Sequence, residues 1–135
     1  MKADADSKMI TAYATTPAST HDSNEFSDLL DEKDQVVYAD STYAGKEVPQ
    51  NVIPEVCEKG CRYKKLTETQ IAENHRKSKV RCRIEHIFGF MTGAMHGITI
   101  RSIGFRRADF NIGLTNLVYN LCRYTFLKRK TKTMG

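Results

Sequence analysis

The sequence predicts an α/β fold in which short strands alternate with helices and two long helices close the chain. Runs of β-branched and aromatic residues recur between residues 9 and 66, separated by residues typical of turns. Apolar residues at helical spacing dominate residues 67–127. With 135 residues, of which 40% are hydrophobic, the chain can build one domain with a real core.

The first strand is expected over residues 9–16, a Thr-rich stretch that ends at Pro17. Asp6-Ser7-Lys8 before it is typical of a hairpin turn, which requires an earlier partner strand. Few residues precede this turn, so the domain is expected to begin after its opening strand. A short helix over residues 24–32 should follow, capped within residues 20–23.

Residues 35–39 form a short apolar run that predicts a buried strand, and Asp40 stands at its end. A weak helix is expected over residues 48–56, with Pro54 interrupting part of it. Residues 61–66 are consistent with one more short, basic strand.

A long helix is predicted from Thr67, because Gln70 three residues later completes a capping box. Its buried stripe is predicted from apolar residues at helical spacing: Val80, Ile84, Ile87, Met91 and Met95. The last helix is expected over residues 106–127. Its predicted inner face consists of Phe110, Leu114, Leu117, Leu121 and Tyr124. The domain should span residues 1–128, and residues 129–135 should form a disordered basic tail.

Charge divides the chain sharply. Residues 1–58 hold four Lys/Arg and twelve Asp/Glu, a net of −8, whereas residues 59–135 hold seventeen Lys/Arg and four Asp/Glu, a net of +13. Such a basic half favours a polyanionic partner, above all double-stranded DNA, although a solvated basic surface would have the same composition.

No apolar run is long enough for a membrane span, and the N-terminus lacks a signal peptide's apolar core. A cytoplasmic protein with reduced cysteines is therefore expected.

Two acidic residues are candidates for catalysis and metal binding. Asp40 follows an apolar strand, and Glu85 lies in an otherwise basic helical stretch. Carboxylates are hard oxygen ligands that suit Mg²⁺ or Mn²⁺, and two such ions can drive phosphodiester chemistry. The alternative is structural: Asp40 could cap a turn, and Glu85 could pair with Arg81 one helical turn away.

Zinc binding is a second alternative. Cys57 and Cys61, followed by Cys82 and His86, have a C-x₃-C and C-x₃-H spacing. This spacing is not a standard zinc pattern, and the neighbouring Lys and Arg residues oppose a dication. Buried, small cysteines explain part of the same pattern.

Several segments, in order, resemble the DDE transposases of the insertion-sequence-five group. Residues 36–45, Val-Val-Tyr-Ala-Asp-Ser-Thr-Tyr-Ala-Gly, resemble the segment around the family's second catalytic Asp. Residues 74–89, which contain Arg81 and Glu85, resemble the segment around its catalytic Glu. Residues 15–23, 106–108 and 117–123 also fit, so the likeness covers about residues 8–128.

The resemblance implies an RNase H-like fold, a mixed sheet with flanking helices. It implies a metal-dependent enzyme that cleaves and transfers DNA strands at transposon ends, with Asp40 and Glu85 as catalytic metal ligands. The basic residues expected to contact DNA phosphates surround the glutamate: Arg76, Lys77, Lys79, Arg81 and Arg83.

The sequence departs from the family pattern in two places. The family's first Asp lies on the opening strand, and neither Asp4 nor Asp6, in the hairpin turn, takes its role. Thr92 stands where the family often has a basic residue, seven positions after the glutamate.

A chain with two of three acids is expected to be inactive alone and to bind metal only when the triad is completed. An upstream fragment could complete it. The competing hypotheses are a non-catalytic DNA-binding protein that inhibits a full-length transposase, and a non-functional remnant.

Overall fold

The chain is mixed α/β, as the sequence predicted, and it forms two compact units. The computed structural model describes residues 1–17, 25–96, 101 and 103–133. The first unit contains Met1–Pro17 and Ile84–Gly135, and the second contains Ala18–Arg83. Each unit has a two-stranded sheet, antiparallel in the first and parallel in the second.

The first unit begins with a β-hairpin, as the turn at residues 6–8 predicted. Strand β1 (Lys2–Ala3) pairs antiparallel with β2 (Ile10–Ala12). Asp4 holds the turn, because its Oδ1 accepts hydrogen bonds from the Ser7 backbone N–H at 2.6 Å and the Ser7 hydroxyl at 2.5 Å. Strand β2 is shorter than the predicted residues 9–16, and it stops five residues before Pro17.

The second unit contains two parallel strands, β3 (Val36–Ala39) and β4 (Ile53–Val56). Strand β3 lies where a strand was predicted, but only Ala39 of it is buried, and the helix expected over residues 48–56 was wrong. Backbone hydrogen bonds from Ile53 to Gln35 and from Cys57 to Ala39, 2.9 and 3.1 Å, pin this segment to β3 instead. Pro54 has no N–H to donate, so it breaks a helix but is tolerated at a sheet edge.

Short 3₁₀ turns replace longer predicted elements in this unit. The helix expected over residues 24–32 is reduced to η2 (Ser27–Leu29), and its predicted cap at residues 20–23 lies outside the described residues. A second turn, η3 (Ser41–Tyr43), follows β3. The strand expected over residues 61–66 consists of one bridge between Cys61 and Lys64.

Helix α1 (Glu68–Gly93) begins where the capping box predicted. The Thr67 N–H donates to Gln70 Oε1 at 2.9 Å, and the Gln70 N–H donates to Thr67 Oγ1 at 3.3 Å. Of the predicted buried stripe, Ile87 and Met91 are completely buried, while Val80, Ile84 and Met95 are half-buried. Ile87 and Met91 form the core of the first unit together with Ile10 and Tyr119.

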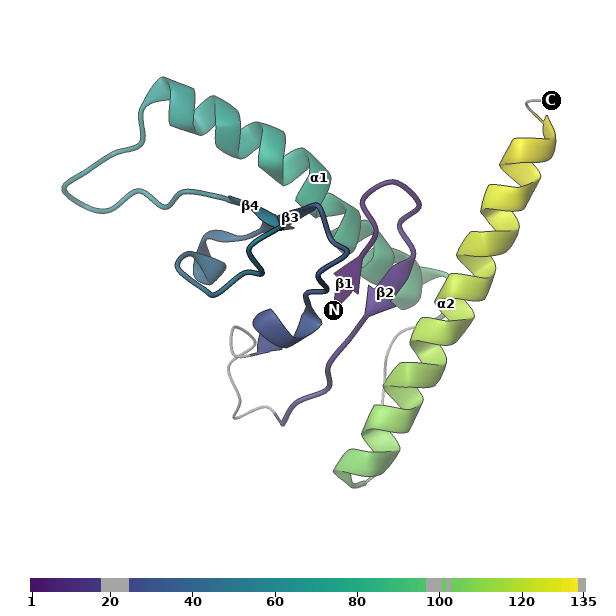
Figure 1. Ribbon diagram of the computed structural model, residues 1–135. Helices are drawn as coiled ribbons and strands as arrows, with labels where there is room; N and C mark the ends of the chain where they lie inside the picture. Colours follow the sequence, from purple (N-terminus) through teal and green to yellow (C-terminus); the bar gives the residue numbers. More distant parts are fainter. Residues whose placement is uncertain (18–24, 97–100, 102, 134–135) are drawn as a thin grey trace. The chain divides into compact units, whose positions relative to one another are not determined.

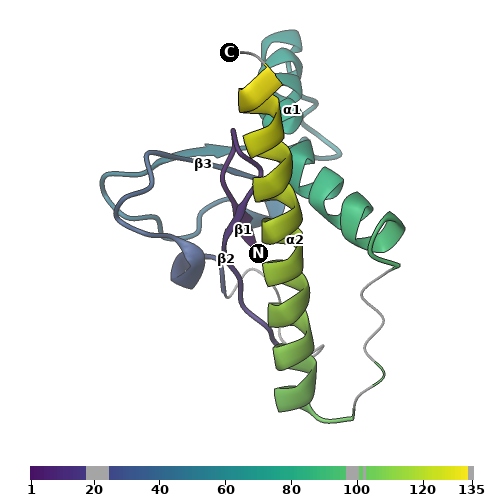
Figure 2. The same cartoon turned by 90° about the vertical axis from the view of Figure 1, so that its right-hand side faces the viewer.

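Helix α2 (Phe105–Thr133) extends beyond the predicted end at residue 127, so residues 129–132 are helical rather than part of a separate tail. Lysine and arginine are good helix formers and interact favourably with a helix C-terminus, which explains the extension. In Figures 1 and 2 the hairpin β1–β2 lies along the middle of α2.

The face of α2 that packs on the hairpin is not the predicted one. Tyr119 and Asn116 are buried, with 4% and 7% of their surface exposed. The five residues expected to face inward are 47–70% exposed: Phe110, Leu114, Leu117, Leu121 and Tyr124. This face packs inward because the helix binds the hairpin through polar side chains, which form hydrogen bonds with the hairpin backbone. No helix among the described residues is long and apolar enough to span a membrane.

Candidate functional site

Asp40 directly follows β3, at the carboxyl end of the parallel pair. It is half-buried and begins the η3 turn as its N-cap, with Oδ1 accepting a hydrogen bond from the Ser41 N–H at 2.7 Å. The cap role that the sequence allowed as an alternative is therefore present. One carboxylate can both cap a turn and offer its second oxygen to a ligand, so the cap also fixes the direction of the carboxylate.

Glu85 lies on α1 and has an exposed side chain. It belongs to the first unit, whereas Asp40 belongs to the second. The next residue, His86, places Nδ1 3.1 Å from Lys8 Nζ of the hairpin turn. Glu85 and His86 are thus exposed, whereas the next residue, Ile87, is completely buried.

The N-terminal half of α1 is attached to β4 by a charged cluster around Glu55. Arg76 Nη2 lies 3.1 Å from Glu55 Oε2, and Lys77 Nζ lies 3.4 Å from the same oxygen. Lys77 also donates to the Val56 carbonyl at 3.0 Å, and its side chain is only 15% exposed. Two of the five residues predicted to contact DNA therefore hold the second unit together.

The same cluster shifts two pKa values. Burial favours the neutral form of Glu55, but the hydrogen bonds and positive charges of Arg76 and Lys77 outweigh it and lower the pKa of this carboxyl below 4.5. Hydrogen bonds to Glu73 and then to Glu55 raise the pKa of Arg76. Glu55 is thus ionised at neutral pH and acts as the anionic partner of both cations.

The remaining predicted DNA contacts differ in exposure. Lys79 is exposed, whereas Arg81 and Arg83 are half-buried. Thr92, which departs from the family pattern, donates its hydroxyl to the Phe88 carbonyl one helical turn back, at 2.9 Å. The helix backbone thus satisfies this hydroxyl.

The residues of the alternative zinc site have other partners. Cys57 is buried with Sγ 3.8 Å from Ser78 Oγ, Cys82 Sγ contacts the Lys79 carbonyl at 3.1 Å, and Cys61 is exposed. His86 faces Lys8. In the part of the chain that the structure describes, no group of three or more His, Cys, Asp or Glu residues could hold a metal ion.

A set of polar contacts that sequence reasoning missed joins α2 to the hairpin. Asn120 pairs with both backbone groups of Ile10, the Tyr119 hydroxyl donates to the Lys8 carbonyl at 2.8 Å, and Arg123 Nε donates to the Ser7 carbonyl at 2.6 Å. Burial raises the pKa of Tyr119, although nearby Arg123 opposes the shift. The only signal in the sequence is that these three polar residues share one helical face.

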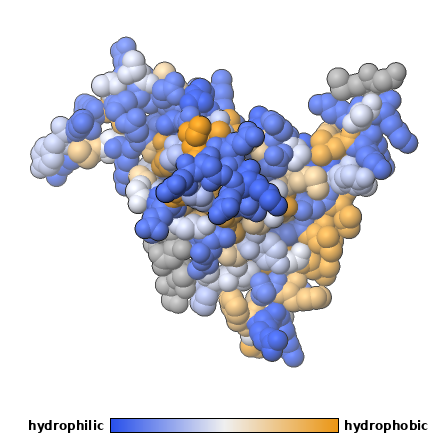
Figure 3. Space-filling model, viewed as in Figure 1, coloured by the Kyte–Doolittle hydropathy of each residue, from blue (hydrophilic) through white to orange (hydrophobic). Residues whose placement is uncertain are grey.

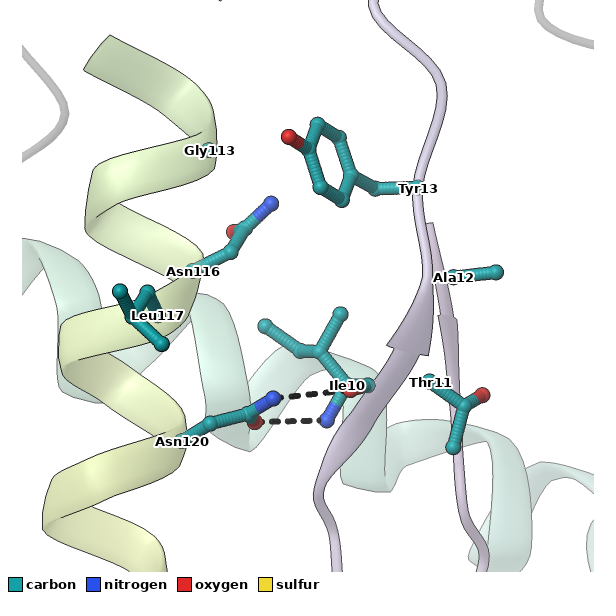
Figure 4. A pocket seen from close by; sticks show the side chains of 8 residues that line it. All are labelled: Ile10, Thr11, Ala12, Tyr13, Gly113, Asn116, Leu117 and Asn120. Carbon is teal, nitrogen blue, oxygen red and sulfur yellow. Dashed lines mark hydrogen bonds between the residues drawn. The ribbon is translucent and has the colours of Figure 1, made fainter. Parts of the chain in front are cut away.

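A shallow pocket of about 200 Å³ lies beside these contacts, between β2 and α2 (Figure 4). The Asn116 side chain lies next to it, one helical turn before Asn120. Tyr13 closes one side and approaches the helix at Gly113, where a Cβ would lie 2.5 Å from the tyrosine hydroxyl. The missing side chain of Gly113 therefore makes room for Tyr13.

Comparison with known proteins identifies the family. The family model described as transposase DDE domain matches residues 1–121, which is most of the chain. Neither the curated proteins nor the solved structures gave a match. The matched region includes β3 with Asp40, all of α1 with Glu85, and α2 up to Leu121. The chain therefore belongs to the family of transposase DDE domains.

Proposed function

We propose that Asp40 and Glu85 are two of the metal-binding carboxylates of a transposase that cleaves and joins DNA at the ends of an insertion sequence. The observation that carries the proposal is the family match over residues 1–121, which includes both acids. The motifs around them favour the insertion-sequence-five group and an RNase H-like arrangement of the complete domain.

The position of Asp40 supports this role. In α/β proteins, ligands bind outside the carboxyl ends of parallel strands, and Asp40 is the first residue after β3. Its hydrogen bond from the Ser41 N–H restricts the side chain. A carboxylate held in this way loses little conformational entropy when it binds a cation.

Glu85 supplies a second oxygen ligand from a helix whose other side is anchored in a core. Because Ile87 and Met91 are completely buried, α1 cannot rotate about its axis without exposing them. This packing keeps Glu85 on the exposed face of the helix.

The donor set suits Mg²⁺ or Mn²⁺, because both prefer carboxylate oxygens. When bound, such ions activate the attacking oxygen and stabilise the leaving oxygen of a phosphodiester. The basic side chains of α1 act on the DNA rather than on the metal. Lys79 is exposed and Arg81 follows it within one helical turn, so both can neutralise DNA phosphates.

Mn²⁺ titration followed by NMR tests the shared site without relying on activity. Paramagnetic Mn²⁺ should broaden the backbone resonances around Asp40 and Glu85 together, at Mn²⁺ concentrations that leave Glu47 and Glu68 unaffected. D40N should remove the broadening around Glu85, and E85Q should remove it around Asp40. Broadening around Glu85 that persists unchanged in D40N would show that the two acids bind metal independently and would overturn the proposal.

A further inference from the structure

The connection between β4 and α1 contains a short basic segment, residues 59–65, called here the basic tip. Its seven residues include no acid and four cations: Lys59, Arg62, Lys64 and Lys65. All four are exposed, and in the described part of the chain no acidic side chain pairs with any of them. In Figure 1 the connection runs outward from β4 and returns to the start of α1, and Figure 3 shows this end of the second unit as mostly hydrophilic. The basic tip therefore offers concentrated positive charge to a partner.

Backbone hydrogen bonds give the basic tip a defined shape. The Cys61 N–H donates to the Lys64 carbonyl at 3.0 Å, and the Lys64 N–H donates to the Cys61 carbonyl at 3.1 Å. These two bonds form an antiparallel bridge that closes a tight turn. Arg62 and Tyr63 are the two residues between the bridged pair, so they stand at the apex.

The base of the basic tip is attached to α1. The Glu58 N–H donates to Asn74 Oδ1 at 2.8 Å, and Asn74 Nδ2 donates to the Glu58 carbonyl at 2.9 Å. Gln70, one helical turn before Asn74, donates from Nε2 to Glu58 Oε2 at 2.5 Å. The residue just before the basic tip is thus held at three points, which lowers the conformational entropy that the tip loses when it binds a partner.

Tyr63 at the apex is 94% exposed, the highest value among the exposed large hydrophobic side chains that the structure describes. Aromatic side chains usually bury about 150–250 Å² each, so an aromatic ring left open to solvent favours a contact with a partner. Cations alone would suit any polyanion. The ring selects among polyanions, because nucleic acid bases offer flat faces that stack on it while cations beside it neutralise the phosphates.

We propose that the basic tip binds a DNA strand with unpaired bases, with one base stacked on Tyr63 and the flanking phosphates held by the four cations. The bases must be unpaired because the faces of stacked base pairs in a duplex are covered by their neighbours. The basic tip thus adds a contact with a base to the phosphate contacts of α1. The inference rests on the proposed function for its choice of DNA as the partner, but it does not depend on Asp40, Glu85 or metal binding.

Two single-stranded oligonucleotides of equal length, one with bases and one built from abasic sites, separate stacking from charge because both have the same phosphates. In fluorescence anisotropy with EDTA present, Y63A should weaken binding of the oligonucleotide with bases roughly tenfold and leave the abasic one unchanged. Y63F keeps the ring and should bind like the native chain. K64Q should weaken binding of both oligonucleotides alike, because it removes a phosphate contact and leaves the ring in place.

A tryptophan at the apex shows whether a base reaches this position. The chain has no Trp, so Y63W adds a single indole. Its fluorescence should be quenched by the oligonucleotide with bases and not by the abasic one. Y124W is the matched control, because Tyr124 is also exposed, 47%, and also lies beside a lysine, with Lys128 Nζ 5.1 Å from its ring centroid. Its fluorescence should change far less than that of Y63W.

Circular dichroism should give the same spectrum for Y63A, K64Q and the native chain, since both side chains are exposed. Binding of the oligonucleotide with bases that Y63A leaves unchanged, or equal quenching of Y63W and Y124W, would overturn this inference and leave the proposed function standing. A native chain that binds neither oligonucleotide nor duplex DNA would overturn both.

Discussion

Asn120 on α2 forms a two-point hydrogen bond with Ile10 on β2. The Ile10 N–H donates to Asn120 Oδ1, and Asn120 Nδ2 donates to the Ile10 carbonyl, both at 2.9 Å (Figure 4). The Asn120 side-chain amide thus pairs with backbone N–H and C=O groups at the edge of β2, as the backbone of a neighbouring strand would. Because Ile10 is itself 8% exposed and part of the core, this pair fixes the hairpin in the first unit.

N120A should therefore destabilise the protein by about 1–3 kcal/mol, because it leaves two backbone groups of a buried residue without their partner. N116A is the matched comparison, one helical turn away on the same face. Asn116 is 7% exposed and borders the pocket, but its side chain has no hydrogen bond to any residue that the structure describes. Urea unfolding should show a clearly smaller loss for N116A than for N120A. Equal losses would mean that packing, and not the Asn120 hydrogen bonds, holds the hairpin.

Glu55 makes the stability of the second unit depend on pH. Arg76 and Lys77 lower its pKa in the folded chain, so the unfolded chain takes up a proton first as the pH falls. The stability that Glu55 contributes is complete above its ordinary pKa of 4.5 and is lost as the pH drops through the lower folded value. The melting temperature should fall from pH 6 to pH 3 more steeply in the native chain than in E55Q. E47Q, which alters an exposed-loop glutamate outside this cluster, should behave like the native chain.

DNA binding should depend on Lys79 more than on its neighbours. Lys79 is exposed, whereas Lys77 is engaged by Glu55 and the Val56 carbonyl. We expect duplex DNA to bind weakly, with little sequence preference, and with an affinity that falls steeply as salt rises. K79A should weaken binding to unrelated duplexes alike and reduce the salt slope by about 1. K33A removes an exposed lysine of the acidic half and should change neither. Fluorescence anisotropy at several salt concentrations measures both the affinity and the salt slope. An affinity independent of salt would contradict the prediction.

The sequence predicts this fold well where local chemistry decides the outcome. Thr67 and Gln70 place the start of α1 because a capping box needs only residues three apart. Residues 53–56 were assigned to a helix because their apolar spacing is ambiguous over so short a segment. Their pairing with β3, seventeen residues away in sequence, makes this segment a strand, and a local sequence pattern cannot indicate such a distant pairing.

The site could be predicted only in part for a related reason. The motifs indicated Asp40 and Glu85, and a cap role for Asp40 was an open alternative, but the sequence did not show that Arg76 would bind Glu55. On α2, apolar periodicity identified the stripe of Leu117 and its neighbours, but the expectation that this stripe faces the core was wrong. Hydrogen bonds from side chains to distant backbone, such as that of Asn120, leave no periodic signal.

The last prediction separates family membership from activity. The purified 135-residue chain should not cleave or join DNA in the presence of Mg²⁺ or Mn²⁺. Two metal ions repel each other, so a two-metal site needs enough carboxylate charge to hold both, and the two acids of the proposed site, Asp40 and Glu85, supply little of it.

Activity should return when a separate segment that carries the family's first acidic strand is added, provided that it assembles with this chain. In that mixture D40N and E85Q should each abolish strand cleavage and leave DNA affinity nearly unchanged, since neither residue is a phosphate-binding cation. K79A should do the reverse and weaken DNA binding while slow cleavage persists at saturating DNA. Gel assays of strand cleavage, run beside anisotropy on the same samples, distinguish the two patterns. Strong metal-dependent cleavage by the unaided chain that disappears in D4N or D6N would show instead that the hairpin turn supplies the third acid.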